Sequence, residues 1–512
     1  MTKRRAVTVL LTLIVFLVPK NSYSASPDMQ AADLLRESLR QMGGEDKLKA
    51  LRTLHFEAAG YRNALEQSER PEGPYIVEYD QISESRDFEH RRWKQETEMR
   101  WQVQPSVKLT ITVADDAATR SFNNQPAPAS RQQVQQAEEE MELGPERILL
   151  TALAASDLRL EPDTVLQSVP QRVVAFTWKA VPVRLFLNRY TSLPTVVEWK
   201  SAYPSDTFWS AWGDVTTRIY YSLWWLYPGG IHYPRQWDTF RDNLPDSVLT
   251  ISELTLNPQL PADEFAIADD ARASFAKRSA LTVDDRPLGL PDQPAVEVTQ
   301  DVVHIPGAWN TTLVKQGDGI VVIEAPIASG YSAKVVAEAE RRWPGIPIKA
   351  AISTSDSWPH IAGVREYVAR GIPVYALDLN LAILQRLVSA PRTLSPDLLA
   401  KSPRAADFHA VSEKTVLGDG PNRLELYPIR GETSERQMMV YFPAHKLLYG
   451  SDPFQKDQSG RYFYPQTVWE LKHAVEREKL QVDTFFMMHM GPTAWSDLDK
   501  AAAQAEHPQP AK

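Results

Sequence analysis

The sequence predicts a two-domain protein of the mixed α+β and α/β classes, with an antiparallel, β-rich N-terminal domain followed by an α/β domain. Its 512 residues exceed the size at which one hydrophobic core stops growing. Between residues 52 and 260 short β-branched and aromatic runs follow one another, whereas strands alternate with helices after residue 300. Hydrophobic residues at 43% and charged residues at 24% are typical of globular domains, which argues against disorder and against a multi-pass membrane protein.

The first 25 residues resemble a secretory signal peptide. Lys3, Arg4 and Arg5 precede an apolar run from Ala6 to Val18, and small residues follow at the place where a signal peptidase cuts. We therefore expect residues 1–25 to be removed and the protein to be exported, either periplasmic or secreted. The alternative is an uncleaved N-terminal anchor, which is the only membrane contact that the sequence suggests.

The charge and the absence of cysteine exclude several classes of function. Removing residues 1–25 takes away four basic residues and no acid, which changes the formal net charge from −9 to −13. An acidic chain without a dense Lys/Arg run is unsuited to nucleic acid. With no cysteine, the chain has no disulfide, no Cys-ligated zinc and no thiol nucleophile.

Residues 28–265 are predicted to form the β-rich domain. An amphipathic helix over residues 29–42 ends at Gly43-Gly44, and a second helical stretch spans about residues 131–155. The order of these elements, with Leu193-Pro194 opening one strand and Gly229 to Pro234 in another, resembles periplasmic lipoprotein-carrier-like half-barrels. That resemblance implies a concave face that can hold an apolar ligand. The aromatic residues that can line it, or that can instead belong to the core, are Phe208, Trp209, Trp212, Trp224, Trp225 and Tyr227.

Residues 266–299 contain scattered Pro, Asp and Ala without periodicity and are predicted to be a linker. The next domain, residues 300–505, begins with alternating strands and helices. The expected elements are strands at 319–324, 348–353 and 374–377 and helices at 332–342 and 361–370.

One segment of this second domain resembles a known family. Residues 351–376 (AISTSDSWPHIAGVREYVARGIPVYA) are similar to the metal-binding strand-loop-helix of the metallo-β-lactamase fold, whose signature is His-x-His-x-Asp-His. The resemblance implies an αββα sandwich over residues 300–505. In that family two metal ions activate a bridging water for hydrolysis.

Most of the family's metal ligands are replaced in this chain. Matched to the signature, its four ligand positions are Ser355, Ser357, Pro359 and His360. A further histidine position falls on Thr433, or on Ser434 if the turn differs by one residue. The bridging acid matches Asp452 in Gly450-Ser451-Asp452, and the last histidine matches His489.

What remains implies at most one metal. Hydroxyl groups are poor ligands for divalent cations at neutral pH, so a dinuclear centre is not expected. His360, Asp452 and His489 are a workable set for one zinc, iron or manganese ion. The alternative is that no metal binds and the three side chains only hydrogen-bond to one another.

Three hypotheses on function follow. The first is an exported metallo-β-lactamase-fold protein with little or no hydrolase activity that acts as a binding or regulatory module. The second is a mononuclear metal-dependent hydrolase, and the third is an apolar-ligand carrier that uses the N-terminal domain. The chain contains no Gly-x-Ser-x-Gly elbow and no Gly-rich phosphate loop, so no catalytic residue is assigned. The expected partner is a small molecule whose identity the sequence leaves open.

Overall fold

The computed structural model describes residues 30–67, 70–101, 105–452 and 465–506. The predicted signal peptide, residues 1–25, lies outside this range. Within it, no helix combines the length and the apolar character needed to cross a membrane. The described chain is a strand-rich mixture of helices and sheets with a large antiparallel sheet, which confirms that part of the predicted fold class.

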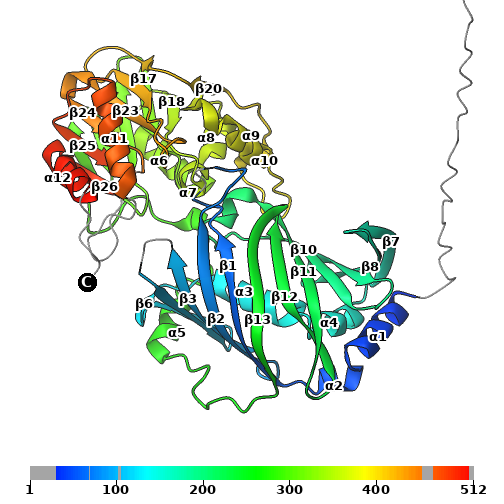
Figure 1. Ribbon diagram of the computed structural model, residues 1–512. Helices are drawn as coiled ribbons and strands as arrows, with labels where there is room; N and C mark the ends of the chain where they lie inside the picture. Colours follow the sequence, from blue (N-terminus) through cyan, green and yellow to red (C-terminus); the bar gives the residue numbers. More distant parts are fainter. Residues whose placement is uncertain (1–29, 68–69, 102–104, 453–464, 507–512) are drawn as a thin grey trace, which may run out of the picture.

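Thirteen strands of the described chain form one antiparallel sheet, here called the N-terminal sheet (Figure 1). Its spatial order is β6-β5-β4-β3-β2-β1-β13-β12-β11-β10-β9-β8-β7. Strands β1 to β6 pair in sequence order, and so do β7 to β13. The pairing of β1 with β13 joins these two halves into one sheet. Its strands are β1 (Thr53–Asn63), β2 (Val77–Asp87), β3 (Arg92–Trp101), β4 (Val107–Ala114), β5 (Ala117–Phe122), β6 (Gln125–Ala127), β7 (Arg159–Leu166), β8 (Val169–Trp178), β9 (Val181–Asn188), β10 (Pro194–Ala202), β11 (Asp214–Tyr227), β12 (Ile231–Arg241) and β13 (Leu244–Leu256).

Helices cover one face of this sheet. They are α1 (Ala31–Met42), α2 (Glu45–Lys49), α3 (Arg131–Leu143) and α4 (Ile148–Ala154), whose apolar residues share cores with the strands. Helix α1 ends as predicted at Gly43, where φ is 123° and a Cβ atom would lie 2.3 Å from the carbonyl oxygen of Gly230. The stretch predicted as one helix is two, because Gly144 and Pro145 interrupt it.

The segment predicted as a linker, residues 266–299, is folded. Helix α5 (Asp269–Ala276) buries Phe275 in the same core as strands β4 and β5. A 3₁₀ turn, η2 (Val283–Asp285), and strand β14 (Val296–Thr299) follow, and β14 pairs with the first strand of the next sheet. The segment therefore packs on both parts of the chain.

The remaining described strands form two sheets packed face to face, here called the C-terminal sandwich. The first is a mixed sheet in sequence order: β14, β15 (Val302–Ile305), β16 (Thr311–Gln316), β17 (Gly319–Ile323), β18 (Ile348–Ser353), β19 (Val374–Leu377) and β20 (Phe408–Val411). The second contains β21 (Thr415–Leu417), β22 (Leu424–Pro428), β23 (Met438–Phe442), β24 (Leu447–Tyr449), β25 (Thr484–Met487) and β26 (Met490–Ala494).

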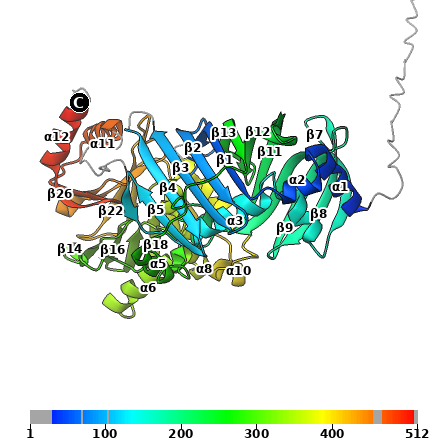
Figure 2. The ribbon, with the colours of Figure 1, turned by 90° about the horizontal axis from the view of Figure 1, so that it is seen from below.

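Helices cover the outer faces of the sandwich, which gives four layers. Alternation along β17 shows why: Val321 and Ile323 enter the core between the sheets, while Ile320 and Val322 pack on the outer helices. The first sheet carries α6 (Ser329–Arg342) and α8 (Val364–Arg370), and the second carries α11 (Pro465–Arg477) and α12 (Trp495–Glu506). The other helices of this part of the described chain are α7 (Trp358–Ile361), α9 (Leu381–Ser389) and α10 (Leu398–Lys401). Helices α12 and α1 lie at opposite ends of the molecule (Figures 1 and 2).

The N-terminal sheet and the C-terminal sandwich meet at a buried junction around Trp358. This indole is 2% exposed and lies edge-on between Trp209 and Trp212, with ring centroids 4.9 and 5.0 Å away. The carbonyl oxygen of Glu66, just after β1, accepts hydrogen bonds from the Ser357 hydroxyl and the Trp358 N–H, both at 3.0 Å. The loop that precedes His360 is thus held by the N-terminal sheet.

The six aromatic residues that the sequence suggested for a ligand-binding face lie elsewhere in the structure. Trp209 and Trp212 belong to the junction, and Phe208 packs against the same core. Trp224 and Tyr227 pack partly buried on the core beneath α1, whereas Trp225 is 54% exposed. None of the six lines the cavity between the N-terminal sheet and α3.

Candidate metal site

The three predicted ligands come together where strands of both sheets end. His360 lies on α7, after β18 of the first sheet; Asp452 follows β24, and His489 follows β25, both of the second sheet. Among the described residues these three form the one group of three or more His, Asp or Glu residues whose ligand atoms all lie within 4.8 Å of one another. The fold therefore assembles residues that are 92 and 37 positions apart in the sequence.

The distances suit one small cation. Nε2 of His360 lies 3.3 Å from Oδ2 of Asp452, and Nε2 of His489 lies 3.0 Å from Oδ1 of the same carboxylate. Tetrahedral ligands about 2.1 Å from a zinc ion are separated by about 3.4 Å. The nitrogen-oxygen separations are therefore close to those of a coordination shell.

The outer nitrogen of His489 makes a hydrogen bond, whereas the outer nitrogen of His360 only lies near a buried acid. Nδ1 of His489 lies 3.1 Å from the carbonyl oxygen of Ala308, so that nitrogen carries the proton and Nε2 is left to bind Asp452 or a metal. Nδ1 of His360 lies 3.9 Å from Oε2 of Glu324, and neither atom has a hydrogen-bond partner in the described structure. A carboxylate or carbonyl behind each histidine is the usual support of a metal-binding imidazole.

Glu324 is the site residue to which the sequence analysis gave no role. It follows β17 directly, is fully buried, and accepts hydrogen bonds from the Tyr449 hydroxyl at 3.0 Å and from the Thr354 hydroxyl. Its φ of 82° is unusual for a residue other than glycine. In the sequence, Glu324 could have been noticed as an acid that ends an otherwise apolar strand. Its position beside His360 depends on the fold.

The electrostatics of the group keep the Asp452 carboxylate ionised. Burial raises the pKa of Glu324, although His360 and Thr354 act against it. Burial acts to lower the pKa of His360, but Asp452 and Glu324 outweigh it and raise that pKa. Burial also acts to raise the pKa of Asp452, yet His360 and His489 hold it well below its usual range. The carboxylate between the two rings is therefore charged and attracts protons or a cation.

The donor set fits a metal better than it fits two protons. Without a metal, two acceptors, the carbonyl oxygen of Ala308 and the carboxylate of Asp452, face the two ring nitrogens of His489, and a neutral imidazole has only one N–H to donate. A divalent metal bound here would take the place of the inner proton on each ring, and the hydrogen bond between His489 and Ala308 would remain. His360, Asp452 and His489 would be its ligands.

At the other ligand positions inferred from the signature, Ser355 and Ser357 make structural contacts through their side chains, and Pro359 and Thr433 make them through their backbone. Ser355 accepts a hydrogen bond from the Ser357 N–H at 3.2 Å, and Ser357 donates to Glu66. Pro359 accepts the Ile327 N–H through its carbonyl oxygen, and the Thr433 N–H donates to Glu470. Ser434, the alternative to Thr433, also donates to Glu470, at 2.6 Å. None of these side chains is a competent cation ligand beside the triad.

Comparisons with known proteins show likeness in structure only. No protein-family model and no curated protein matches the chain. Among solved structures it is similar to a metallo-β-lactamase from Erythrobacter litoralis, at 15% identity over 41% of this chain and 95% of that one, with a TM-score of 0.32. A metallo-β-lactamase from Pontibacter korlensis gives 14% identity over 42% and 98%, with a TM-score of 0.33.

A third neighbour is the stereoselective inverting sec-alkylsulfatase Pisa1 from Pseudomonas sp., at 14% identity over 43% of this chain and 41% of that one, with a TM-score of 0.32. At these TM-scores the likenesses assign neither a family nor an activity to the chain. The case for a metal site rests on the geometry of its own residues.

Proposed function

We propose that the C-terminal sandwich is a metallo-β-lactamase-like domain that binds one divalent metal through His360, Asp452 and His489 and has little or no hydrolase activity. The observation that carries the proposal is the geometry of the triad, in which two imidazoles face one carboxylate and His489 is held by a hydrogen bond to the carbonyl oxygen of Ala308. The four-layer order of helices and sheets and the signature-like segment 351–376 support it.

The loss of hydrolase activity is inferred from the missing half of the site. A two-metal hydrolase needs ligands where Ser355, Ser357 and Pro359 lie, and these residues instead hold the loop and join it to the N-terminal sheet. His360 is 1% exposed, so a bulky substrate does not reach it. A stable, metal-bound surface for recognition is the better use of this arrangement.

One observation favours a second candidate, the mononuclear hydrolase. The side chains of Asp452 and His489 are 17% and 16% exposed, so one side of the triad is open to water. A metal with three protein ligands and one free position can lower the pKa of a water molecule and polarise a carbonyl or phosphoryl group. In that case Glu324 and Ala308 serve to keep both rings in place.

We expect the chain, purified without chelator or added metal, to contain about one equivalent of zinc, iron or manganese. The variant His360→Ala/His489→Ala is expected to retain less than about a tenth of an equivalent, since one carboxylate alone binds weakly. A matched control is His409→Ala/His473→Ala, because these histidines stack on Tyr375 and Trp469 outside the site. Elemental mass spectrometry gives the metal content of all three proteins.

The same proteins separate the two functions. Zinc-loaded wild type that hydrolyses chromogenic β-lactams or esters, with turnover lost in the His360→Ala/His489→Ala variant, would establish the hydrolase. Stoichiometric metal without turnover supports the binding module. Metal content that stays below about a tenth of an equivalent after soaking with zinc would exclude both and leave a hydrogen-bonded triad.

A further inference from the structure

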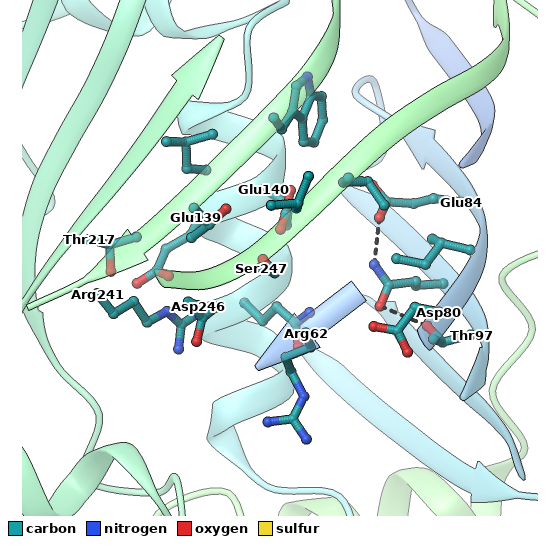
Figure 3. Close-up of a pocket in the computed structure, with 18 of the residues that line it drawn as sticks. Arg62, Asp80, Glu84, Thr97, Glu139, Glu140, Thr217, Arg241, Asp246 and Ser247 are labelled. Atoms are coloured by element: carbon teal, nitrogen blue, oxygen red, sulfur yellow. Dashed lines mark hydrogen bonds and ion pairs between the residues drawn. The ribbon is translucent and has the colours of Figure 1, made fainter. Parts of the chain in front are cut away.

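A cavity of about 310 Å³ lies between the N-terminal sheet and helix α3 (Figure 3). Strands β1 to β4 line one side, β10 to β13 line the other, and α3 closes it. The volume is at the lower end of the range of small-molecule sites. The cavity contains no residue of the candidate metal site, so it is an independent feature.

Acidic side chains dominate the polar lining. Seven carboxylates face two arginines, Arg62 and Arg241. The carboxylates are Glu78, Asp80, Glu84, Glu139, Glu140, Asp206 and Asp246. In a concave, partly buried space this excess raises the local concentration of cations.

The arginines neutralise only part of the charge. Arg62 pairs with Glu66 and Glu78 at 3.0 and 3.1 Å, and Arg241 lies 3.8 Å from Asp246. Arg86, which does not line the cavity, pairs with Glu84 and Glu140, which do.

Three acids of the lining, Asp80, Glu139 and Asp206, have no cationic partner within 4.0 Å among the described residues, and Asp206 accepts hydrogen bonds from the Phe208 and Trp209 N–H groups. Oδ1 of Asp80 is buried and has no hydrogen-bond partner there. Glu139 is 7% exposed and bonds only to neutral groups, Gln135 and Tyr203. Figure 3 shows Asp80 and Glu84 on one side of the cavity and Glu139 and Asp246 on the other.

The pKa values reflect this crowding. Burial, followed by the charge of Glu78, raises the pKa of Asp80 to about 7. Burial and then Glu84 raise the pKa of Glu140 to about 7, and burial raises the pKa of Glu139. The folded structure therefore disfavours the ionised form of these three carboxyl groups.

The raised pKa of Asp80 predicts how stability depends on pH. Between pH 3.8 and about 7 the folded chain keeps a proton on Asp80 that the unfolded chain releases, so this contribution to stability is lost as pH rises. Thermal unfolding should show wild type gaining a few degrees in Tm from about pH 8 to about pH 5.5 relative to Asp80→Asn. Identical changes in the two proteins would contradict the raised pKa.

The rest of the lining is apolar and aromatic. The rings are those of Phe56, Trp199, Tyr203, Tyr221 and Trp237, and aliphatic side chains such as Ile82 and Leu109 lie between them. Such walls suit methylene groups, and the ring faces also attract ammonium groups. A fully hydrated ion would gain nothing from them.

We propose that this cavity binds a linear aliphatic polyamine. Its ammonium groups would pair with acids on the two sides of the cavity while its methylene chain lies along the aromatic walls. A fatty acid is unsuited to the cavity, because its carboxylate would lie beside the carboxylates of the lining and be repelled by them. A single metal ion is also unsuited, because no three acids of the cavity place ligand atoms within 4.8 Å of one another among the described residues.

The test is isothermal titration calorimetry with spermidine as the probe. Wild type is expected to bind one spermidine per chain, more tightly than the monoamine butylamine, whereas palmitate is expected not to bind. In the variant Asp80→Asn/Glu139→Gln, which keeps the side-chain shapes, affinity for spermidine should fall at least about ten-fold, as expected for loss of desolvated charge pairs.

The control is Glu253→Gln/Asp292→Asn, which removes two exposed acids outside the cavity and changes the net charge equally. Its affinity should stay within about two-fold of wild type, since exposed, distant charges are screened. If the cavity variant does not fold, as judged by circular dichroism, the single variant Asp80→Asn replaces it, with an expected loss of at least about three-fold. Absence of saturable binding, or equal losses in the cavity and control variants, would overturn the proposal.

Discussion

Replacing Arg86 with methionine is expected to lower the free energy of unfolding by about 3–5 kcal/mol. Arg86 is fully buried, and its guanidinium bonds Glu84 at 2.6 Å, Glu146 at 2.7 Å and Glu140 at 3.0 Å. It also lies over the ring of Phe56 at 5.6 Å. Its removal leaves these carboxylates, two of them fully or almost fully buried, without their cation. Urea denaturation followed by circular dichroism measures the loss.

Two further variants test whether the loss of stability in Arg86→Met comes from the buried carboxylates left without a cation. Arg91→Met removes an arginine that is 61% exposed and pairs with Glu142, and it should cost less than about 1 kcal/mol. Adding Glu146→Gln to Arg86→Met should recover part of the stability, because it removes one of the carboxylates left unpaired. A loss below about 1 kcal/mol in Arg86→Met itself would mean that the buried acids find other partners.

The second large effect is expected from Trp358→Ala. The change removes a buried indole that is wedged between Trp209 and Trp212, and the resulting cavity should cost about 3–5 kcal/mol. Trp358 also begins α7, which carries His360, so the same change should reduce the metal content. Urea denaturation and elemental mass spectrometry on the same preparation measure the two consequences.

Substitutions of graded size separate packing from other causes. Trp358→Phe keeps an aromatic ring at the junction and should lose less stability and retain more metal than Trp358→Ala. Trp225→Ala, at a side chain that is 54% exposed, should lose less than about 1 kcal/mol and keep full metal content. Full metal content in Trp358→Ala would show that His360 is positioned without the junction.

The sequence by itself determined the local elements and the residue types of the candidate site. Periodicity predicted α1 and its end at Gly43, and the alternation after residue 300 corresponds to β17, α6, β18, α8 and β19. These signals are local, since each depends on neighbours within one or two turns or along one strand. The resemblance to a known signature singled out His360, Asp452 and His489, and their convergence could be expected from strand ends that share one edge of a sandwich.

Only the tertiary structure decided what surrounds these residues. The contact of Glu324 with His360, the carbonyl oxygen of Glu66 that receives Ser357, and the indole of Trp358 between two tryptophans join residues that are 36 to 291 positions apart in the sequence. The acidic cavity beside α3 likewise depends on the pairing of β1 with β13. Contacts of this kind depend on which distant strands pair and on how whole layers pack, and a pattern of neighbouring residues does not say which distant segments meet.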